Sequence, residues 1–424
     1  MNVLIITYYF PPSGGSGVQR WLKFIKYLPK EGVNPIVYTV KNAKYPIIDT
    51  SLEEEIPNGI EILKQPIFEP NNLFAAFEKK EKQGAGFLNK TPSFFGKILQ
   101  YIRANYFIPD ARKFWIKPSV KYLSNYINNN NIDTIITTGP PHSLHLIGLA
   151  LKKKTNINWI ADFRDPWTDI DYFHQLPLTK KSINKHHQLE QKVLKNANHI
   201  LVVGKTMKDK YLPYNKNIKV ITNGFDTFKN KNKIDLDKKF SLLHIGMLNS
   251  DRNHTILWKV LNEISKNNTE FKKDLQIKLI GKISDDTFES IKKYDLYDFV
   301  KHLNYINHNE VIVHQKAAQV LVLLVNNVPS AKGIITGKIF EYLQAKRPIL
   351  AIAPTQGDLS EIIENTKSGF VIDFDDEKKL KKTILELYQS YKNNTLAIQS
   401  INIEQYHRKE LTKKLANLLN SIHQ

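Results

Sequence analysis

The sequence predicts an α/β protein built from two doubly wound domains, each with a parallel sheet covered by helices. Apolar runs of strand length alternate with amphipathic segments of helix length, which is typical of strands wrapped by helices. This alternation starts a second time near the middle of the chain. The chain has 424 residues, more than one hydrophobic core ordinarily holds, so two domains are expected.

The first series begins at the N-terminus. A strand over 3–8 leads into the loop YFPPSGGSG, which is followed by a helix from Val18 to about Lys30. Further strands are predicted over 35–40, 133–138, 158–162 and 199–204, the last three with helices between them.

The second series repeats this order. A strand over 241–246 is followed by the loop MLNSDRN, a helix over 254–266 and a strand over 275–281. Strands over 320–325, 348–353 and 369–374 complete the series. Each series therefore opens with a strand that has glycine at or just behind its end, in the loop of the first series and at Gly246 in the second.

A polar segment over 226–239 separates the two series and has the composition of a linker. We therefore expect an N-terminal domain over 1–225 and a C-terminal domain over 226–402. The stretch from about 69 to 119 breaks the alternation and is aromatic and basic. It is either an embellishment packed on the first core or an amphipathic element that rests on a membrane or grips a lipid-linked substrate.

Composition narrows the function classes. The chain has no cysteine, which excludes disulfides, thiolate catalysis and cysteine-ligated metals. The formal net charge is +20, which suits nucleic acid, an anionic membrane or phosphorylated substrates. The lysines are scattered rather than gathered, so a generally solvated surface explains the charge equally well.

The apolar runs are too short to span a membrane, which requires about 18 residues or more. The opening MNVLIITYYF lacks the basic start of a signal peptide, and PPSGGSG stands where a cleavage site would be. We expect a first strand there and a cytoplasmic protein.

Residues with chemical potential follow the predicted strands of both domains. Ligands of open α/β sheets gather at the carboxyl ends of the strands, and we expect them in a cleft between the two domains. The candidates are Gly14, Gly15, Gly17, His142, Asp162, Arg164, Gly246, Arg252, Lys338 and Glu341.

The short motifs are weak when taken singly. GGSG before a helix exposes backbone amides to an anion, but it fits neither the dinucleotide pattern nor a P-loop, and a structural turn explains it equally well. Asp169 and Asp171 form a D-x-D pair that arises easily by chance. His142 and His145 have no third ligand at a useful spacing, so no metal site is predicted.

Lys338 and Glu341 stand three residues apart on one short predicted helix and share a face of it. The pair is either a solvated ion pair or a clamp for two ends of one ligand.

In combination the motifs are specific. YYFPPSGGSGVQRWLKFIKYL, TTGPPHSLHLIGLAL, WIADFRDPWT, VITNGFD, HIGMLNSDR and GKIFEYLQAKRPILAIAPTQGDLSEII follow one another in order. In this order and spacing the chain resembles the GT-B glycosyltransferases, and glycosyltransferase family four in particular, over nearly its whole length.

The resemblance implies two Rossmann-like domains facing each other across a cleft, with a nucleotide-sugar donor held mainly by the second. It implies a final helix, here about 404–422 within a segment over 403–424, that returns to the first domain. It also implies catalysis without a metal or other cofactor.

The resemblance further assigns roles. Lys338 would meet the donor diphosphate and Glu341 the nucleotide ribose. Arg252 and Lys338 would supply positive charge during catalysis, and Gly15 and Gly246 would border the donor. We expect Gly14, Gly17, His142, Asp162 and Arg164 on the acceptor side, with His142 also catalytic. For Asp162, a salt-bridged structural corner within DFRDPW is an equal alternative.

The chain departs from the family at one point. Where the E-x7-E pattern has its first glutamate, which touches the donor sugar, this sequence has Gly333. Either other groups hold the sugar, such as amides of the loop SAKGIITG, or the chain has lost ordinary donor chemistry.

The sequence as a whole therefore indicates a retaining glycosyltransferase that uses a nucleoside-diphosphate sugar and a saccharide or lipid-linked acceptor, in cell-surface polysaccharide synthesis. It would bind no nucleic acid and would lie at the inner face of the membrane. The alternatives are an epimerase-like enzyme of the same fold and a basic binding protein without catalysis.

Peripheral membrane contact is predicted for 94–117. The basic residues expected there are Lys97, Arg103, Arg112, Lys113 and Lys117, and the apolar ones are Phe94, Phe95, Tyr101, Phe107 and Trp115.

Overall fold

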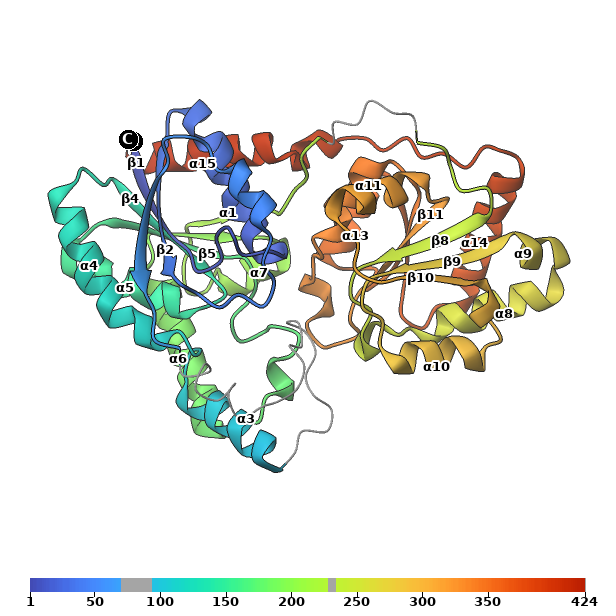
Figure 1. The fold of residues 1–424 in the computed structure, drawn as a ribbon, viewed down its shortest axis with the longest axis horizontal. Coiled ribbons are helices and arrows are strands. Elements are labelled where there is room, and N and C mark those ends of the chain that lie inside the picture. Colours follow the sequence, from blue (N-terminus) through green and yellow to red (C-terminus); the bar gives the residue numbers. More distant parts are fainter. Residues whose placement is uncertain (70–93, 228–233, 424) are drawn as a thin grey trace. The chain divides into compact units, whose positions relative to one another are not determined.

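The computed structural model describes residues 1–69, 94–227 and 234–423, and it divides into two compact units (Figure 1). The first unit comprises 1–223 and 408–424, and the second comprises 224–407. Each unit is built around one parallel sheet, as the two series of strands predict.

The sheet of the first unit has the order β3-β2-β1-β4-β5-β6-β7, with every neighbouring pair parallel. Its strands are β1 (Asn2–Ile6), β2 (Asn34–Lys41), β3 (Glu61–Pro66), β4 (Thr134–Gly139), β5 (Asn158–Phe163), β6 (His199–Val202) and β7 (Ile218–Val220). The order reverses between β1 and β4, which is the point of such a sheet where ligands ordinarily bind.

Helices cover both faces of this sheet. They are α1 (Ser16–Tyr27), α4 (Ile116–Asn129), α5 (Ser143–Thr155), α6 (Lys180–Asn196), α7 (Lys205–Tyr211) and α15 (Arg408–Ile422), whereas α3 (Phe94–Tyr106) of the same unit contributes none of its described side chains to the two cores. Leu4 and Ile6 of β1 face a core shared with α4, α5 and α6, whereas Val3 and Ile5 face a core shared with α1 and α15. This alternation is the two-residue period of a strand that is buried on both faces.

The second sheet has the order β10-β9-β8-β11-β12-β13, again parallel throughout. Its strands are β8 (Phe240–Ile245), β9 (Leu275–Ile280), β10 (Val300–Leu303), β11 (Val320–Leu324), β12 (Ile349–Ile352) and β13 (Gly369–Ile372). The strand order reverses between β8 and β11.

The helices of the second unit are α8 (Thr255–Asn267), α9 (Thr269–Asp274), α10 (Asp285–Lys293), α11 (His308–Ala317), α12 (Lys338–Ala345), α13 (Asp358–Thr366) and α14 (Glu377–Lys392). One core joins the sheet to α8, α9 and α14, and the other joins it to α12 and α13. The unit therefore repeats the three-layer arrangement of the first.

The chain passes between the units after Asn223 and again after His407, whereas the sequence placed these points at 225 and 402. Part of the predicted linker, 228–233, lies outside the described residues, and so does 70–93 of the predicted insertion. The predicted first helix ends at Tyr27 rather than Lys30, because the chain continues as a 3-10 turn that contains Pro29.

Candidate functional site

At the switch point of the second sheet, side chains link β8 and β11 where their backbone pairing ends. β8 and β11 pair only at Leu242 with Val320 and at Leu243 with Leu321. Beyond these pairs the strands are linked through His244, whose Nδ1 lies 3.2 Å from the carbonyl oxygen of Val322. The hydroxyl of Tyr342 donates to the same carbonyl at 3.4 Å and accepts from the amide of Ile245 at 3.4 Å.

Lys338, the first residue of α12, extends its amine toward this switch point. Its Nζ lies 3.5 Å from Nε2 of His244. A Cβ on Gly246 would lie 2.7 Å from Cε and 3.0 Å from Nζ of Lys338. Gly246 also has a φ of 96°, so glycine is required there both for backbone conformation and for space.

Arg252 is held by the loops that follow β8 and β11. Its Nε donates to Oδ1 of Asn326 at 2.5 Å, and its Nη1 donates to the carbonyl of Met247 at 3.2 Å. The guanidinium lies close enough to Lys338 to lower the pKa of that amine. The second unit therefore brings Arg252 and Lys338 together at the carboxyl ends of its strands.

Lys338 carries a perturbed amine. Burial is the main cause that lowers its pKa to about 7, and Arg252 lowers it further, whereas Glu341 raises it. The pKa of His244 is held well below its ordinary value by burial, then by Lys338 and Arg252. Two neighbouring cations without a bound anion are unfavourable, so this arrangement suits an anionic ligand.

Glu341 lies in the first turn of α12, three residues after Lys338, and its carboxylate bonds a different partner. Its Oε2 accepts a hydrogen bond from Nε2 of Gln315, at 3.0 Å. Gln315 belongs to α11 and is 1% exposed, and its Oε1 has no hydrogen-bond partner among the described residues. A carboxylate that is fixed and half-buried in this way can accept hydrogen bonds from ligand hydroxyls.

In the first unit, the glycine loop joins β1 to α1. The amide of Gly14 donates to the carbonyl of Ile47 at 2.9 Å, and a Cβ on Gly14 would lie 2.8 Å from Cγ2 of Ile47. Gly15 is the N-cap of α1, with a φ of 85° that favours glycine. The carbonyl of Gly17 accepts from Nη1 of Arg164 at 2.6 Å, which ties this loop to the end of β5.

Asp162 lies inside the first unit and is 0% exposed. Its carboxylate accepts hydrogen bonds from Nε and Nη2 of Arg20, at 3.1 and 2.9 Å. It also accepts from the indole of Trp21 at 2.8 Å and from the hydroxyl of Thr138 at 2.9 Å. The carboxylate is committed to internal partners, which is the geometry of the structural corner rather than of an acceptor contact.

His142 lies at the N-terminus of α5 and is 8% exposed. Its ring stacks on Trp167, with centroids 4.8 Å apart and planes 5° from parallel. Burial is the main cause that holds its pKa well below the ordinary value, followed by His145 and Arg164. The ring is therefore neutral and can accept a hydrogen bond, whereas its lowered pKa disfavours full protonation.

His142 and His145 converge over Gly139. A Cβ on Gly139 would lie 2.8 Å from Nδ1 of His142 and 2.6 Å from Nε2 of His145. Neither nitrogen has a hydrogen-bond partner among the described residues. Within those residues no three histidine or carboxylate side chains are arranged to hold a metal ion.

Comparison with protein families gives two matches that together span nearly the whole chain. Residues 16–229 match the model described as Glycosyltransferase Family 4, and residues 225–403 match the one described as Glycosyl transferases group 1. The first match alone covers half of the sequence. The chain belongs to glycosyltransferase family 4.

Solved structures similar to this family 4 enzyme share its GT-B fold. Sucrose-phosphate synthase from Thermosynechococcus elongatus is 14% identical, covers 100% of this chain and 99% of its own, and has a TM-score of 0.60. Anabaena HepE in complex with UDP and glucose is 14% identical, covers 99% of each chain, and has a TM-score of 0.59.

A third similar structure is a putative UDP-N-acetylglucosamine 2-epimerase from Listeria monocytogenes. It is 11% identical, covers 100% of this chain and 96% of its own, and has a TM-score of 0.57. No curated protein matches the sequence. The predicted fold class and family are confirmed.

The family 4 glycosyltransferase differs from its family's sequence pattern at Gly333, which ends a 3-10 turn (Ala331–Gly333). The amide of Gly333 donates to the carbonyl of Ser330 and that of Ile334 to the carbonyl of Ala331, each at 3.1 Å. These two amides are therefore bonded within the turn. The prediction that loop amides hold the donor sugar therefore does not extend to these two amides.

The sequence did not single out His244, Gln315, Asn326 or Tyr342 for the site. His244 could have been found from the sequence, because it is a titratable residue inside the apolar run SLLHIG. Gln315 and Asn326 gave none, since their importance comes from the partners that folding brings to them.

The membrane prediction requires a correction. Trp115 is 0% exposed and stacks on Tyr38 with ring centroids 4.9 Å apart, so it is a core residue. Arg112 pairs with Glu69 at 3.2 Å and lies over the ring of Tyr8, so its positive charge is compensated by groups within the first unit. The side chains of Phe94 and Phe95 lie outside the described residues.

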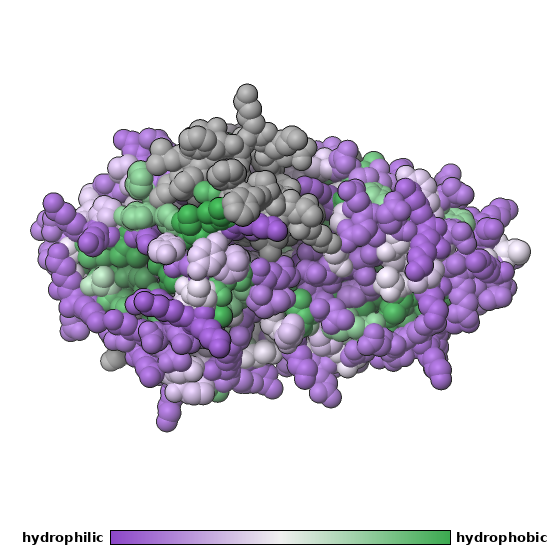
Figure 2. Space-filling model, turned by 90° about the horizontal axis from the view of Figure 1, so that it is seen from below, coloured by the Kyte–Doolittle hydropathy of each residue, from purple (hydrophilic) through white to green (hydrophobic). Residues whose placement is uncertain are grey.

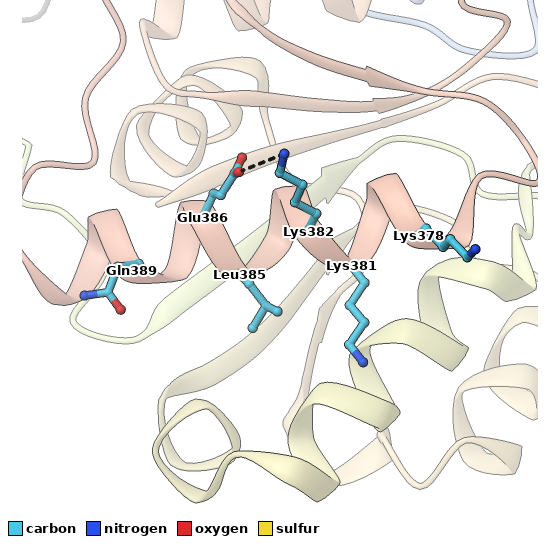
Figure 3. Close-up of a pocket in the computed structure, with 6 residues that line it drawn as sticks. All are labelled: Lys378, Lys381, Lys382, Leu385, Glu386 and Gln389. Carbon is cyan, nitrogen blue, oxygen red and sulfur yellow. Dashed lines mark ion pairs between the residues drawn. The ribbon is translucent and has the colours of Figure 1, made fainter.

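The described helices include none that is both long and apolar enough to cross a membrane. Figure 3 shows a surface hollow on α14, and the residues that line it are Lys378, Lys381, Lys382, Leu385, Glu386 and Gln389. Two of its lysines are paired, Lys381 with Glu263 at 2.6 Å and Lys382 with Glu386 at 3.8 Å. This hollow is a solvated helix face, and we assign it no function.

Proposed function

We propose that this family 4 glycosyltransferase retains the anomeric configuration and moves a sugar from a nucleoside diphosphate to a saccharide or lipid-linked saccharide in cell-surface glycan synthesis. The observation that carries this proposal is the convergence of Arg252 and Lys338 at the switch point of the second sheet, with Glu341 one turn away. Two cations fit a diphosphate, and a carboxylate fits the ribose hydroxyls.

Cleavage of the bond between the anomeric carbon and the phosphate oxygen leaves negative charge on the departing diphosphate. Fixed positive charge at that position stabilises the transition state more than the ground state. In this proposal Arg252 and Lys338 supply that charge without a metal ion or cofactor. The acceptor hydroxyl attacks the anomeric carbon and transfers its proton to the leaving phosphate.

On the acceptor side we place His142, Arg164 and the loop of Gly14 and Gly17, while Gly15 and Gly246 border the donor. Nδ1 of His142 has no hydrogen-bond partner among the described residues and would accept a hydrogen bond from the acceptor hydroxyl, whose proton passes to the leaving phosphate. Asp162 is left out of this set, because its oxygens are all engaged inside the unit.

Uridine nucleotides are the first donors to test, because HepE is bound to UDP in one structure and to UDP-glucose in another. The experiment screens a panel of nucleoside-diphosphate sugars for a rise in Tm, then supplies the best donor with saccharide and lipid-linked acceptors. A ligand that binds only the native state raises its stability. Stabilisation by a donor followed by a product with the original anomeric configuration supports the proposal, and an inverted product contradicts the retaining mechanism.

A nucleotide-sugar epimerase is the second candidate, because the putative epimerase from Listeria monocytogenes has the same fold. An epimerase needs no acceptor. Incubating the stabilising donor alone and analysing its sugar separates the two: an altered sugar without acceptor favours epimerisation, and an unchanged donor favours transfer.

We also propose that the surface around α3 touches an anionic membrane. Figure 2 shows apolar residues gathered in patches on the first unit's part of the face it draws. Exposed apolar side chains of this region are Phe68, Ile98, Tyr101, Tyr106 and Phe114. Lys97, Arg103, Lys113 and Lys117 add positive charge, and the amine of Lys113 lies over the rings of Phe107 and Phe114.

A further inference from the structure

We propose that His244 is a positioning residue for Lys338, which it holds at the switch point so that the ammonium group faces the donor diphosphate. This inference deepens the proposed function and rests on it, because it assumes that Lys338 binds the diphosphate. None of the sequence motifs assigns a role to His244.

The contacts of Val322 and Lys338 with the ring of His244 are both satisfied by one tautomer. Nδ1 lies 3.2 Å from the carbonyl oxygen of Val322, which can only accept, so we assign the hydrogen to Nδ1; the backbone of Met247 is a further hydrogen-bond partner of the ring. Nε2 is then left with a lone pair, 3.5 Å from Nζ of Lys338. An ammonium group can only donate, so the neutral ring is an acceptor directed at Lys338.

The surroundings keep the ring neutral and in place. His244 is 2% exposed, and the hydroxyl of Tyr342 bonds the same Val322 carbonyl from the other side. The charged groups that face the ring are Lys338 and Arg252, both cations, which oppose a third positive charge. Glu341, on the same helix as Lys338, is the carboxylate that favours the charged amine.

Gly246 also borders the amine, since a Cβ there would lie 3.0 Å from Nζ. The amine of Lys338 is thus close both to the backbone of Gly246 and to the ring of His244. A long lysine side chain ordinarily loses considerable rotamer freedom when it binds a ligand. Placement of the amine beside these groups before the donor arrives lessens this loss, which is the advantage of a preorganised site.

Two substitutions test separately the two hydrogen bonds that the His244 ring makes with Val322 and Lys338. His244→Asn places an amide nitrogen where Nδ1 stands, so it keeps the donor to Val322 and loses the acceptor for Lys338. His244→Gln places an oxygen near the position of Nε2, so it keeps an acceptor for Lys338. A hydrogen bond to a charged group corresponds to roughly 10- to 100-fold in affinity, so we expect this loss of UDP affinity in the Asn variant and partial recovery in the Gln variant.

UDP binding is measured by calorimetry on the full chain, with Tm as the measure of folding. His254→Asn is the matched control, because His254 is 8% exposed and its Nε2 lies 2.8 Å from the carbonyl of Val325 on the chain following β11. We expect this control to lower Tm without a comparable loss of UDP affinity. Equal UDP affinity in His244→Asn and the wild type, or stronger binding in the Asn variant than in the Gln variant, overturns the proposal.

A measurement without nucleotide keeps this inference distinct from the proposed function. In the full chain labelled with ¹⁵N-histidine, the His244 signals are assigned by their loss in His244→Asn. We expect a protonated Nδ1, a bare Nε2, and an Nε2 signal that moves when Lys338 titrates but stays fixed in Lys338→Met. A ring protonated on Nε2 overturns the inference whatever the protein binds, whereas the expected signals without UDP binding contradict only the function.

Discussion

At the scale of single residues, the amine of Lys338 connects the geometry of the second unit with its chemistry. Burial and the nearby Arg252 bring its pKa to about 7, so near neutral pH the amine is divided between charged and neutral forms. Only the ammonium form attracts a diphosphate. A bound diphosphate would in turn favour the ammonium form, so binding and protonation are linked.

We therefore expect UDP affinity to fall as pH rises from about 6 to about 9, with close to one proton taken up per nucleotide bound above about pH 7. The sign follows from the lowered pKa, since the free site loses the proton in this range and must regain it on binding. Calorimetry in two buffers of different ionisation enthalpy measures the uptake. Lys338→Met should bind more weakly and lose this proton uptake; uptake that persists in the variant would assign it to another group.

Asp162 shows what the sequence leaves undecided at a single position. DFRDPW is compatible with an acceptor contact and with a structural corner, and both place a carboxylate at the end of a strand. The decision comes from Arg20, which stands 142 positions earlier and reaches the carboxylate only after folding.

At the scale of elements, this ion pair ties α1 to β5. Both partners are buried, with side-chain exposures of 2% and 0%. Arg20 also donates to the carbonyl of Thr222 at 2.9 Å, so the same guanidinium anchors the segment that leads out of the first unit. Removing one partner of a buried pair leaves the other charge without compensation.

We expect Asp162→Asn to lower the free energy of unfolding of the first unit by about 3–5 kcal/mol, measured by denaturant unfolding. Asp165→Asn is the control, because Asp165 is 47% exposed, pairs with Arg164 at 3.4 Å, and should cost less than about 1 kcal/mol. An Asp162→Asn protein of unchanged stability that has lost only sugar transfer would support the acceptor role instead.

α3 is the element on which the membrane proposal depends. Asn105 anchors it: its Nδ2 donates to the carbonyl of Pro177 at 2.8 Å, and its Oδ1 accepts from the amide of Thr179 at 2.8 Å. The helix is thus fixed to the start of α6, while Ile98 and Tyr101 remain 41% and 44% exposed.

Sedimentation with vesicles tests this surface. We expect more protein to bind anionic than neutral vesicles, and Lys97→Glu with Lys113→Glu to abolish the difference, since each basic residue contributes about 1 kcal/mol near such a surface. Lys378→Glu with Lys382→Glu on α14 is a control of equal charge change. If both pairs reduce binding equally, the attraction comes from the overall charge of the chain and not from α3.

At the scale of the whole molecule, the two sheets were predictable because buried parallel strands form continuous apolar runs. HILVVG and VLVLLV read as strands for this reason, and the order of the strands identified two doubly wound units. The pairing of Arg252 with Lys338 was also accessible, since both follow strands of one sheet. Contacts such as those of Gln315 with Glu341 and Arg20 with Asp162 were not, because they join residues with no local pattern in common.

Gly333 bears on the donor that the whole enzyme accepts. We assign nucleotide binding to Arg252, Lys338 and Glu341 and sugar binding to other groups. We therefore expect a donor sugar that is deoxygenated, acetamido-substituted or otherwise unlike plain glucose. Gly333→Glu should then leave transfer from the native donor unimproved, as measured by initial rates across the donor panel. Strong transfer from an ordinary hexose donor, appearing only in this variant, would show that the wild-type chain has lost donor chemistry.

We propose above all that the second unit binds a nucleoside diphosphate through Lys338 and Glu341. The rise in Tm that UDP produces in four proteins tests this binding most directly. We predict a clear rise in the wild type and in Lys378→Met, where the altered lysine lies on the surface of α14 (Figure 3). We predict a much smaller rise in Lys338→Met and in Glu341→Gln, because each loses an interaction that only the native state makes with the ligand. A rise of equal size in all four proteins would place the nucleotide elsewhere and contradict the account.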